Sequence, residues 1–126
     1  MDKKRPKNLN LITIRLPLPA LVSILHRLSG LILFLILPGV LFALHLSLES
    51  QQGFQIVLGY AVHPLTKLVL IAVCWAFLHH LFAGLRHLLS DLNLGMELRQ
   101  AVLINRMVLS SSLFLTFLIG MSLWWV

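Results

Sequence analysis

The chain has 126 residues, of which 59% are hydrophobic and only 11% are charged, and its formal net charge at pH 7 is +6. A soluble domain carries about a quarter charged residues, so this composition excludes an ordinary soluble enzyme. The basic residues flank apolar segments, a placement that indicates membrane orientation rather than nucleic-acid binding. We therefore predict an all-α membrane protein embedded in the lipid bilayer, with no nucleic acid as a partner.

Three long stretches contain no Asp, Glu, Lys or Arg, and they cover residues 28–48, 68–85 and 107–126. Each is close to the roughly 20 residues that cross about 30 Å of hydrocarbon. The pattern predicts three transmembrane helices, over about residues 20–48, 64–89 and 104–126. Residues 1–19 are polar and then proline-punctuated, so we expect them at the cytoplasmic surface of a membrane domain that spans residues 20–126.

The connections between the predicted helices differ in charge, which predicts their orientation. The N-terminal segment and the second connection hold most of the basic residues: Lys3, Lys4, Arg5, Lys7, Arg86, Arg99 and Arg106. The first connection holds only Glu49, with Lys67 at its far edge. The positive-inside rule then places the N-terminus in the cytoplasm and the C-terminus in the periplasm.

The first predicted helix opens with polar side chains where a membrane segment should be apolar. Ser23 and Arg27 share a face, whereas His26 stands about 60° away around the helix. Arg27 would reach the cytoplasmic surface by snorkelling, with Ser23 bonded to its own backbone. The alternative is that these side chains line a polar pocket, and spacing alone leaves both interpretations open. Further along this helix, Pro38-Gly39 predicts a kink.

The second predicted helix carries an ordered polar stripe after an outer loop at 49–63. His80, Gly84, His87 and Asp91 fall within about 60° of one another, whereas the neighbouring His79 points elsewhere. Unpaired polar groups in a membrane cost several kcal/mol, so the stripe needs partners. The glycine leaves a flat hollow against which a planar group would lie. We infer a haem with His80 as the axial ligand of its iron, the alternative being a histidine hydrogen-bonded to a neighbouring helix. His79 is more typical of packing.

The topology brings the two polar groups to one membrane level, because the first helix runs outward and the second inward. The haem propionates would then face His26, Arg27 and His87 near the cytoplasmic side. The same pocket would hold a quinone head group, with Ser23 and Arg27 as hydrogen-bond donors. After an inner loop at 90–103, with Gly95 as the expected helix stop, the third helix ends in an aromatic pair at the outer interface.

Two stretches of the chain resemble signatures of a known family. The N-terminal stretch RPKNLNLITIRLPLPALVSILHRLSG (residues 5–30) resembles that of the cytochrome b membrane-anchor subunit of bacterial succinate dehydrogenase. The second signature, H-x3-G-x-R-H-x3-D, is matched by His80, Gly84, Arg86, His87 and Asp91. Length, number of spans and orientation are also similar, so the resemblance covers the whole chain.

The resemblance implies a four-subunit complex in the bacterial inner membrane that passes electrons from succinate to ubiquinone. Its partners are a flavoprotein subunit, an iron–sulfur subunit and a second membrane anchor that shares one haem b. The resemblance makes His80 one ligand of the iron and gives the other histidine to the second anchor. It places Ser23 and Arg27 at the ubiquinone site, and His26 and Arg27 near the propionates. The alternatives are a fumarate reductase anchor and a small transporter subunit whose histidines relay protons.

Overall fold

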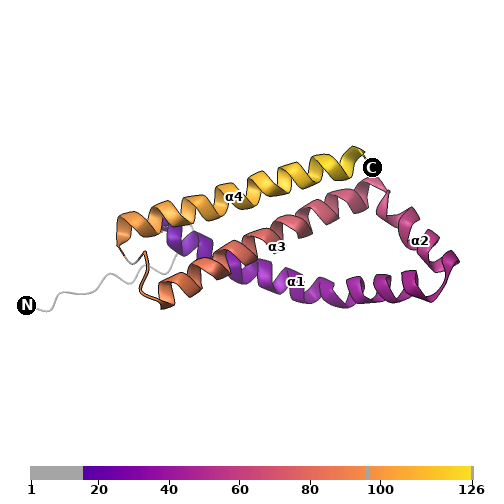
Figure 1. The fold of residues 1–126 in the computed structure, drawn as a ribbon, viewed down its shortest axis with the longest axis horizontal. Helices are drawn as coiled ribbons and strands as arrows, with labels where there is room; N and C mark the ends of the chain where they lie inside the picture. Colours follow the sequence, from indigo (N-terminus) through magenta and orange to yellow (C-terminus); the bar gives the residue numbers. More distant parts are fainter. Residues whose placement is uncertain (1–15, 96, 126) are drawn as a thin grey trace, which may run out of the picture.

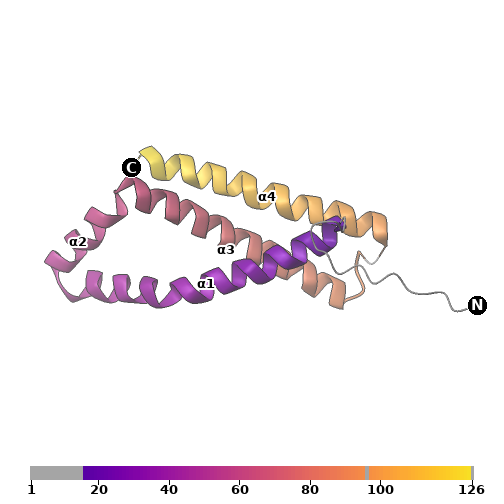
Figure 2. The same cartoon turned by 180° about the vertical axis from the view of Figure 1, so that it is seen from behind.

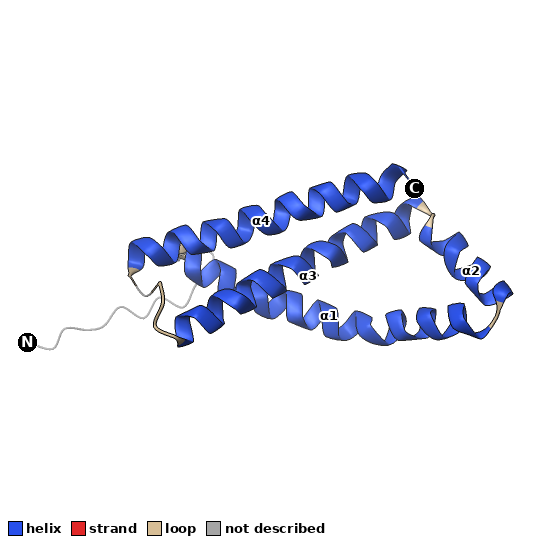
Figure 3. Ribbon diagram, in the orientation of Figure 1, coloured by secondary structure: helices blue, strands red, loops and turns tan. Residues whose placement is uncertain are grey.

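A computed structural model describes residues 16–95 and 97–125, and every regular element in this part of the chain is a helix (Figure 3). The helices are α1 (Leu18–Glu49), α2 (Gln51–Ala61), α3 (Pro64–Asp91) and α4 (Leu98–Trp125). The three long helices are apolar enough to span a membrane, and each contains an 18-residue window whose mean hydropathy is 2.5, 2.1 or 1.8, in chain order. The prediction of an all-helical chain with three candidate spans is therefore confirmed.

The helix boundaries differ from the predicted ones where polar residues extend a helix beyond the apolar run. The third span begins at Leu98 rather than near residue 104, because its first turns carry interfacial polar side chains. The predicted outer loop is largely α2, which Ser50 caps by accepting a hydrogen bond from the Gly53 backbone N–H at 3.0 Å. Of the predicted interfacial segment 1–19, residues 1–15 lie outside the described residues. Its end already belongs to α1.

Proline and left-handed residues mark the helix ends. A proline occupies the first turn of both α1 and α3, where its missing N–H removes no helix hydrogen bond. α3 ends at Asp91, and the turn after it uses positive φ angles at Asn93 (59°) and Gly95 (73°). Pro38 lies inside α1 without interrupting it, and the ribbon of α1 changes direction along its length (Figure 1).

The long helices form a bundle in which α3 packs against both α1 and α4. Figures 1 and 2 show that α1 crosses α3 near the end where α1 begins, and that the two helices then diverge. The short helix α2 bridges the gap at the wide end, and the C-terminus lies at that same end (Figure 1). The start of α1 therefore lies beside the end of α3, as the antiparallel topology predicts.

The core of the bundle is small, and most large apolar side chains lie on its surface. Val22, Ala83 and Val108 form a buried cluster that joins the three long helices. Ser112, Thr116 and Gly120 continue the buried face of α4, and both hydroxyls donate to carbonyls of their own helix. Small residues at helix contacts and large apolar residues outside are typical of membrane bundles, in which lipid covers the outer surface.

Candidate functional site

Three histidines meet where α1 crosses α3. The His26 ring of α1 stacks on the His80 ring of α3, with centroids 4.2 Å apart and an interplanar angle of 11°. The His26 ring also lies 5.1 Å from the His87 ring, with an interplanar angle of 52°. The two polar groups that the sequence placed at one membrane level therefore do come together, with His26 next to both histidines of α3.

The hydrogen bonds of His80 define its tautomer. Its Nδ1 lies 3.0 Å from the backbone carbonyl oxygen of His26 and 3.3 Å from the Ser29 hydroxyl. A carbonyl only accepts, so Nδ1 carries a proton, and in the neutral imidazole Nε2 then carries the lone pair. Within residues 16–95 and 97–125, no hydrogen bond reaches Nε2. Metal-bound histidines usually donate their second ring N–H in this way, which fixes the ring and strengthens the coordinating nitrogen.

Gly30 of α1 gives the stacked rings their room, whereas a Cβ at Gly84 of α3 would meet them only at ordinary contact distance. A Cβ added at Gly30 would lie 2.8 Å from Cε1 of His80, so the ring fits only because α1 has no side chain there. A Cβ at Gly84 would lie 3.6 Å from Nε2 of His26. The hollow expected at Gly84 thus faces the imidazole of His26. The sequence interpretation gave Gly30 no role, although a Ser-Gly pair one turn after His26 was a visible signal of close approach.

His79 lies in a different environment from its neighbour His80. It is fully buried and stacks on Trp75, with ring centroids 5.3 Å apart and an interplanar angle of 23°. Neither ring nitrogen of His79 forms a hydrogen bond within the described residues, although the carbonyl of Val22 lies nearby. This burial in the bundle agrees with the expectation that His79 serves packing, whereas His80 faces the crossing with α1.

The remaining predicted site residues are less tightly placed. Ser23 is half-buried and Arg27 is exposed, and no hydrogen bond joins either to the three histidines in the described part of the chain. Asp91 is exposed at the last position of α3. Arg86 contacts its chain neighbour, with its Nη1 3.5 Å from Nδ1 of His87. The structure thus brings His26, His80 and His87 together and leaves Ser23 and Arg27 without a hydrogen bond to this cluster in the described residues.

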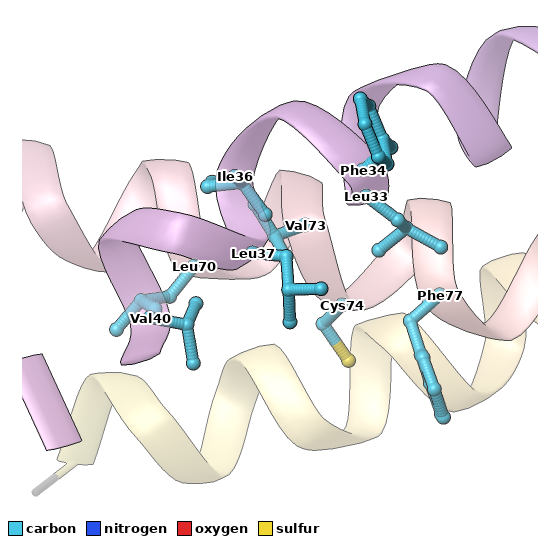
Figure 4. Close-up of a pocket in the computed structure, with 9 residues that line it drawn as sticks. All are labelled: Leu33, Phe34, Ile36, Leu37, Val40, Leu70, Val73, Cys74 and Phe77. Atoms are coloured by element: carbon cyan, nitrogen blue, oxygen red, sulfur yellow. The ribbon is translucent and has the colours of Figure 1, made fainter. Parts of the chain in front are cut away.

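An apolar groove of about 590 Å³ lies between α1 and α3 on the wide side of the crossing (Figure 4). Its walls include Leu33 and Leu37 of α1, and Cys74 and Phe77 of α3. Phe77 precedes His80 by three residues, so the groove begins about one helical turn from the histidines. The walls of the groove provide apolar contacts for a neighbouring molecule, whereas the polar side chains lie at the crossing of α1 and α3.

The described residues hold no cluster of three His, Cys, Asp or Glu side chains that would enclose a metal ion. A single histidine with an oriented ring nitrogen would instead suit a haem, whose iron can be held by a histidine. The fold and the site together define a helical membrane protein with a histidine cluster at one membrane level.

The comparisons with known proteins give the family. The family model described as succinate dehydrogenase/fumarate reductase transmembrane subunit matches residues 1–119, and the chain belongs to this family. A succinate dehydrogenase cytochrome b556 subunit from Coxiella burnetii is 41% identical over 98 residues, which cover 73% of this chain and 74% of that protein. Proteins with the same description from Paracoccus denitrificans and Rickettsia felis are 32% and 31% identical, over 90% and 92% of this chain and 88% and 90% of their own lengths. The resemblance drawn from the two signatures is confirmed.

Proposed function

We propose that this chain is the haem b-carrying membrane anchor of a succinate dehydrogenase, and that it helps to pass electrons from succinate oxidation to ubiquinone. Family membership and the three apolar spans support the anchoring role. The similar proteins are described as cytochrome b556 subunits, which favours haem over the alternative of a proton-relaying transporter subunit. The same names favour succinate dehydrogenase over fumarate reductase.

His80 is the proposed axial ligand of the haem iron. The observation that carries this assignment is the hydrogen bond from its Nδ1–H to the carbonyl oxygen of His26, because it leaves the lone pair of Nε2 for a metal. Bound haem b would supply a one-electron carrier at this level of the membrane. The protein's part is to orient the imidazole in advance of binding.

The residues beside His80 suit the two ends of a haem. His26 stacks on His80 with ring centroids 4.2 Å apart, His87 lies 5.1 Å from His26, and Arg27 follows His26 on α1. We assign these three side chains to the propionates, because carboxylates buried at a membrane surface need cationic or hydrogen-bonding partners. The apolar groove lies on the opposite side of His80 from His87, where it would receive uncharged parts of the assembly.

Ser23 and Arg27 are the proposed donors to the ubiquinone head group. They occupy the first turns of α1, one turn apart, at positions where the side chain is half-buried and exposed, respectively. A hydroxyl and a guanidinium in this position would hydrogen-bond a quinone oxygen that approaches from the lipid side. Neither residue is committed to the histidine cluster, which leaves both available to a ligand.

We place the chain in a bacterial inner membrane with its N-terminus in the cytoplasm, because the basic residues gather at the end where α1 begins. The histidine cluster then faces the cytoplasmic side, where the flavoprotein and the iron–sulfur subunit would dock. A second membrane anchor would cover the side of α1 and α3 that carries His80 and supply the other haem histidine.

The test compares two adjacent histidines that differ in environment. His80→Ala should abolish or severely disturb the b-type absorbance in a reduced-minus-oxidised spectrum of the purified complex. His79→Ala serves as the matched control and should largely keep that absorbance, because its ring packs inside the bundle. Normal absorbance in the His80 variant together with its loss in the His79 variant would move the ligand by one position.

A further inference from the structure

Ser29 stands out among the polar side chains of α1, because it is buried and bonds across a helix crossing. Its side chain lies one turn after His26 and is 1% exposed. The hydroxyl of Ser29 donates to the carbonyl oxygen of His26 at 2.9 Å. The hydroxyl oxygen of Ser29 also lies 3.3 Å from Nδ1 of His80. Ser29 therefore contacts both members of the hydrogen bond that orients His80.

The placement of the hydrogens follows from what each group can donate. The carbonyl of His26 only accepts, so it takes the hydroxyl hydrogen of Ser29 and the Nδ1 hydrogen of His80. With its single hydrogen used, the Ser29 oxygen presents a lone pair to Nδ1. The N–H of His80 is thus shared between two acceptors, the carbonyl and the hydroxyl.

We propose that Ser29 is a positioning residue for His80, one that sets the ring plane and the electron-donating strength of Nε2. This inference rests on the proposed function of His80 as a haem ligand. A second acceptor on Nδ1–H makes the imidazole a stronger donor, and hydrogen bonds of this kind tune the potential of a haem. Two acceptors on different atoms also resist rotation of the ring, whose edge is already confined by Gly30.

Packing alone does not account for this arrangement. Three other serines in the described residues donate to the carbonyl three positions earlier: Ser47, Ser110 and Ser112. Such bonds satisfy a hydroxyl within its own helix. Of these four serines in the described part of the chain, Ser29 alone also bonds to a side chain on another helix. Ser112 is as buried as Ser29, which makes it a matched control.

The experiment measures the haem in the assembled complex in membranes, by potentiometric titration and by electron paramagnetic resonance of the ferric state. Ser29→Ala removes one acceptor and should shift the midpoint potential to more positive values and displace the low-spin signal. Ser29→Cys keeps a weak acceptor of similar size and should give a smaller shift in the same direction. Ser112→Ala should leave both readouts as in the wild type.

A wild-type potential and signal in a haem-loaded Ser29→Ala variant would overturn the proposal, as would an equal shift in Ser112→Ala. If Ser29→Ala loses its haem, the Cys variant decides: retained haem with a shifted potential supports positioning, whereas wild-type behaviour or equal loss of haem overturns it. Failure of the ligand assignment is separate, because it would appear as b-type absorbance that survives in His80→Ala.

Discussion

At the scale of single residues, the orientation of His80 depends on the backbone of another helix. The carbonyl of His26 accepts its Nδ1–H, and the absence of a side chain at Gly30 admits its ring. The imidazole is therefore held before any ligand binds. A coordinating side chain that is already held in one orientation loses less entropy when it binds a metal than one that must be ordered from several rotamers.

The quinone assignment makes a prediction for two other side chains of α1. Ser23→Ala and Arg27→Leu should each lower kcat/KM for ubiquinone reduction by about tenfold, the loss of roughly one hydrogen bond to the head group. Oxidation of succinate by an artificial acceptor at the soluble subunits should survive, since those subunits are unchanged. The two rates are compared in the same membrane preparation.

Ser47→Ala provides the control for that measurement. Ser47 lies near the opposite end of α1, and its hydroxyl is already bonded to the carbonyl of Leu44 at 2.8 Å. Its removal should leave both rates unchanged. Equal loss of both activities in the Ser23 or Arg27 variants would indicate failed assembly and contradict a role at the quinone.

The sequence alone identified the polar side chains at the crossing but not all their contacts. His26, His80 and His87 stand out because ionisable groups are rare in apolar helices, and the antiparallel topology predicted their level. The contributions of Ser29 and Gly30 were missed, because they depend on how α1 is rotated against α3. The periodicity of one helix does not contain that rotation. His79 and His80 were separable, since adjacent residues point about 100° apart.

At the scale of elements, α3 and α4 pack in an antiparallel register that small residues permit. Ala83 meets Val108 in the buried cluster, and Gly120 faces Ile71 near the other end of the pair. A Cβ added at Gly120 would lie 3.4 Å from the Ile71 side chain, at the tight limit of ordinary contact. The two helices therefore approach closely along this face.

Gly120→Leu should separate α3 from α4 and destabilise the chain by about 1–3 kcal/mol, as overpacking does in tightly packed interiors. The measurement is the thermal denaturation of the detergent-solubilised complex. Gly39→Leu is the matched control, because a Cβ at Gly39 has no heavy atom within 4 Å. Equal melting temperatures for the two variants would show that the close contact between α3 and α4 does not determine the stability of the complex.

Apolar length predicted which segments are helical better than where each helix ends. The runs without charge located three spans. However, α4 begins at Leu98, six residues before the expected start at 104, and its first turn includes Arg99 and Gln100. Residues at a membrane interface can be helical without being apolar, so a hydropathy pattern underestimates the length of a helix at such ends. Residues 49–63 were expected as an outer loop with at most a short amphipathic turn, whereas α2 covers eleven of them.

At the scale of the whole molecule, the proposed haem site calls for a second chain. His79 is enclosed in the bundle, and His26 stacks on the ring of His80 itself. His45 and His63 lie beyond the middle of the bundle, near α2. His87 is already assigned to the propionates, so a haem that takes an imidazole on each side of its iron would draw the second one from outside this chain.

Expressed alone, this chain should give little or no stoichiometric bis-histidine haem, and co-expression with the second anchor should restore it. The low-temperature haem spectrum and the haem-to-protein ratio provide the measurement. A stoichiometric bis-histidine signal from a demonstrated monomer would contradict the ligand count. The same signal from a homodimer would show that two copies of His80 suffice.

The divergence of α1 from α3 also has a consequence for assembly. Because the groove between them opens sideways, acyl chains occupy it whenever no protein does, and they are as apolar as its leucines. A helix that enters the groove leaves contact with lipid for contact with equally apolar side chains, so hydrophobicity contributes little to which helix binds there. Selection of the correct partner then depends on how closely its surface follows this wedge, and lipids that fill the wedge well compete with it.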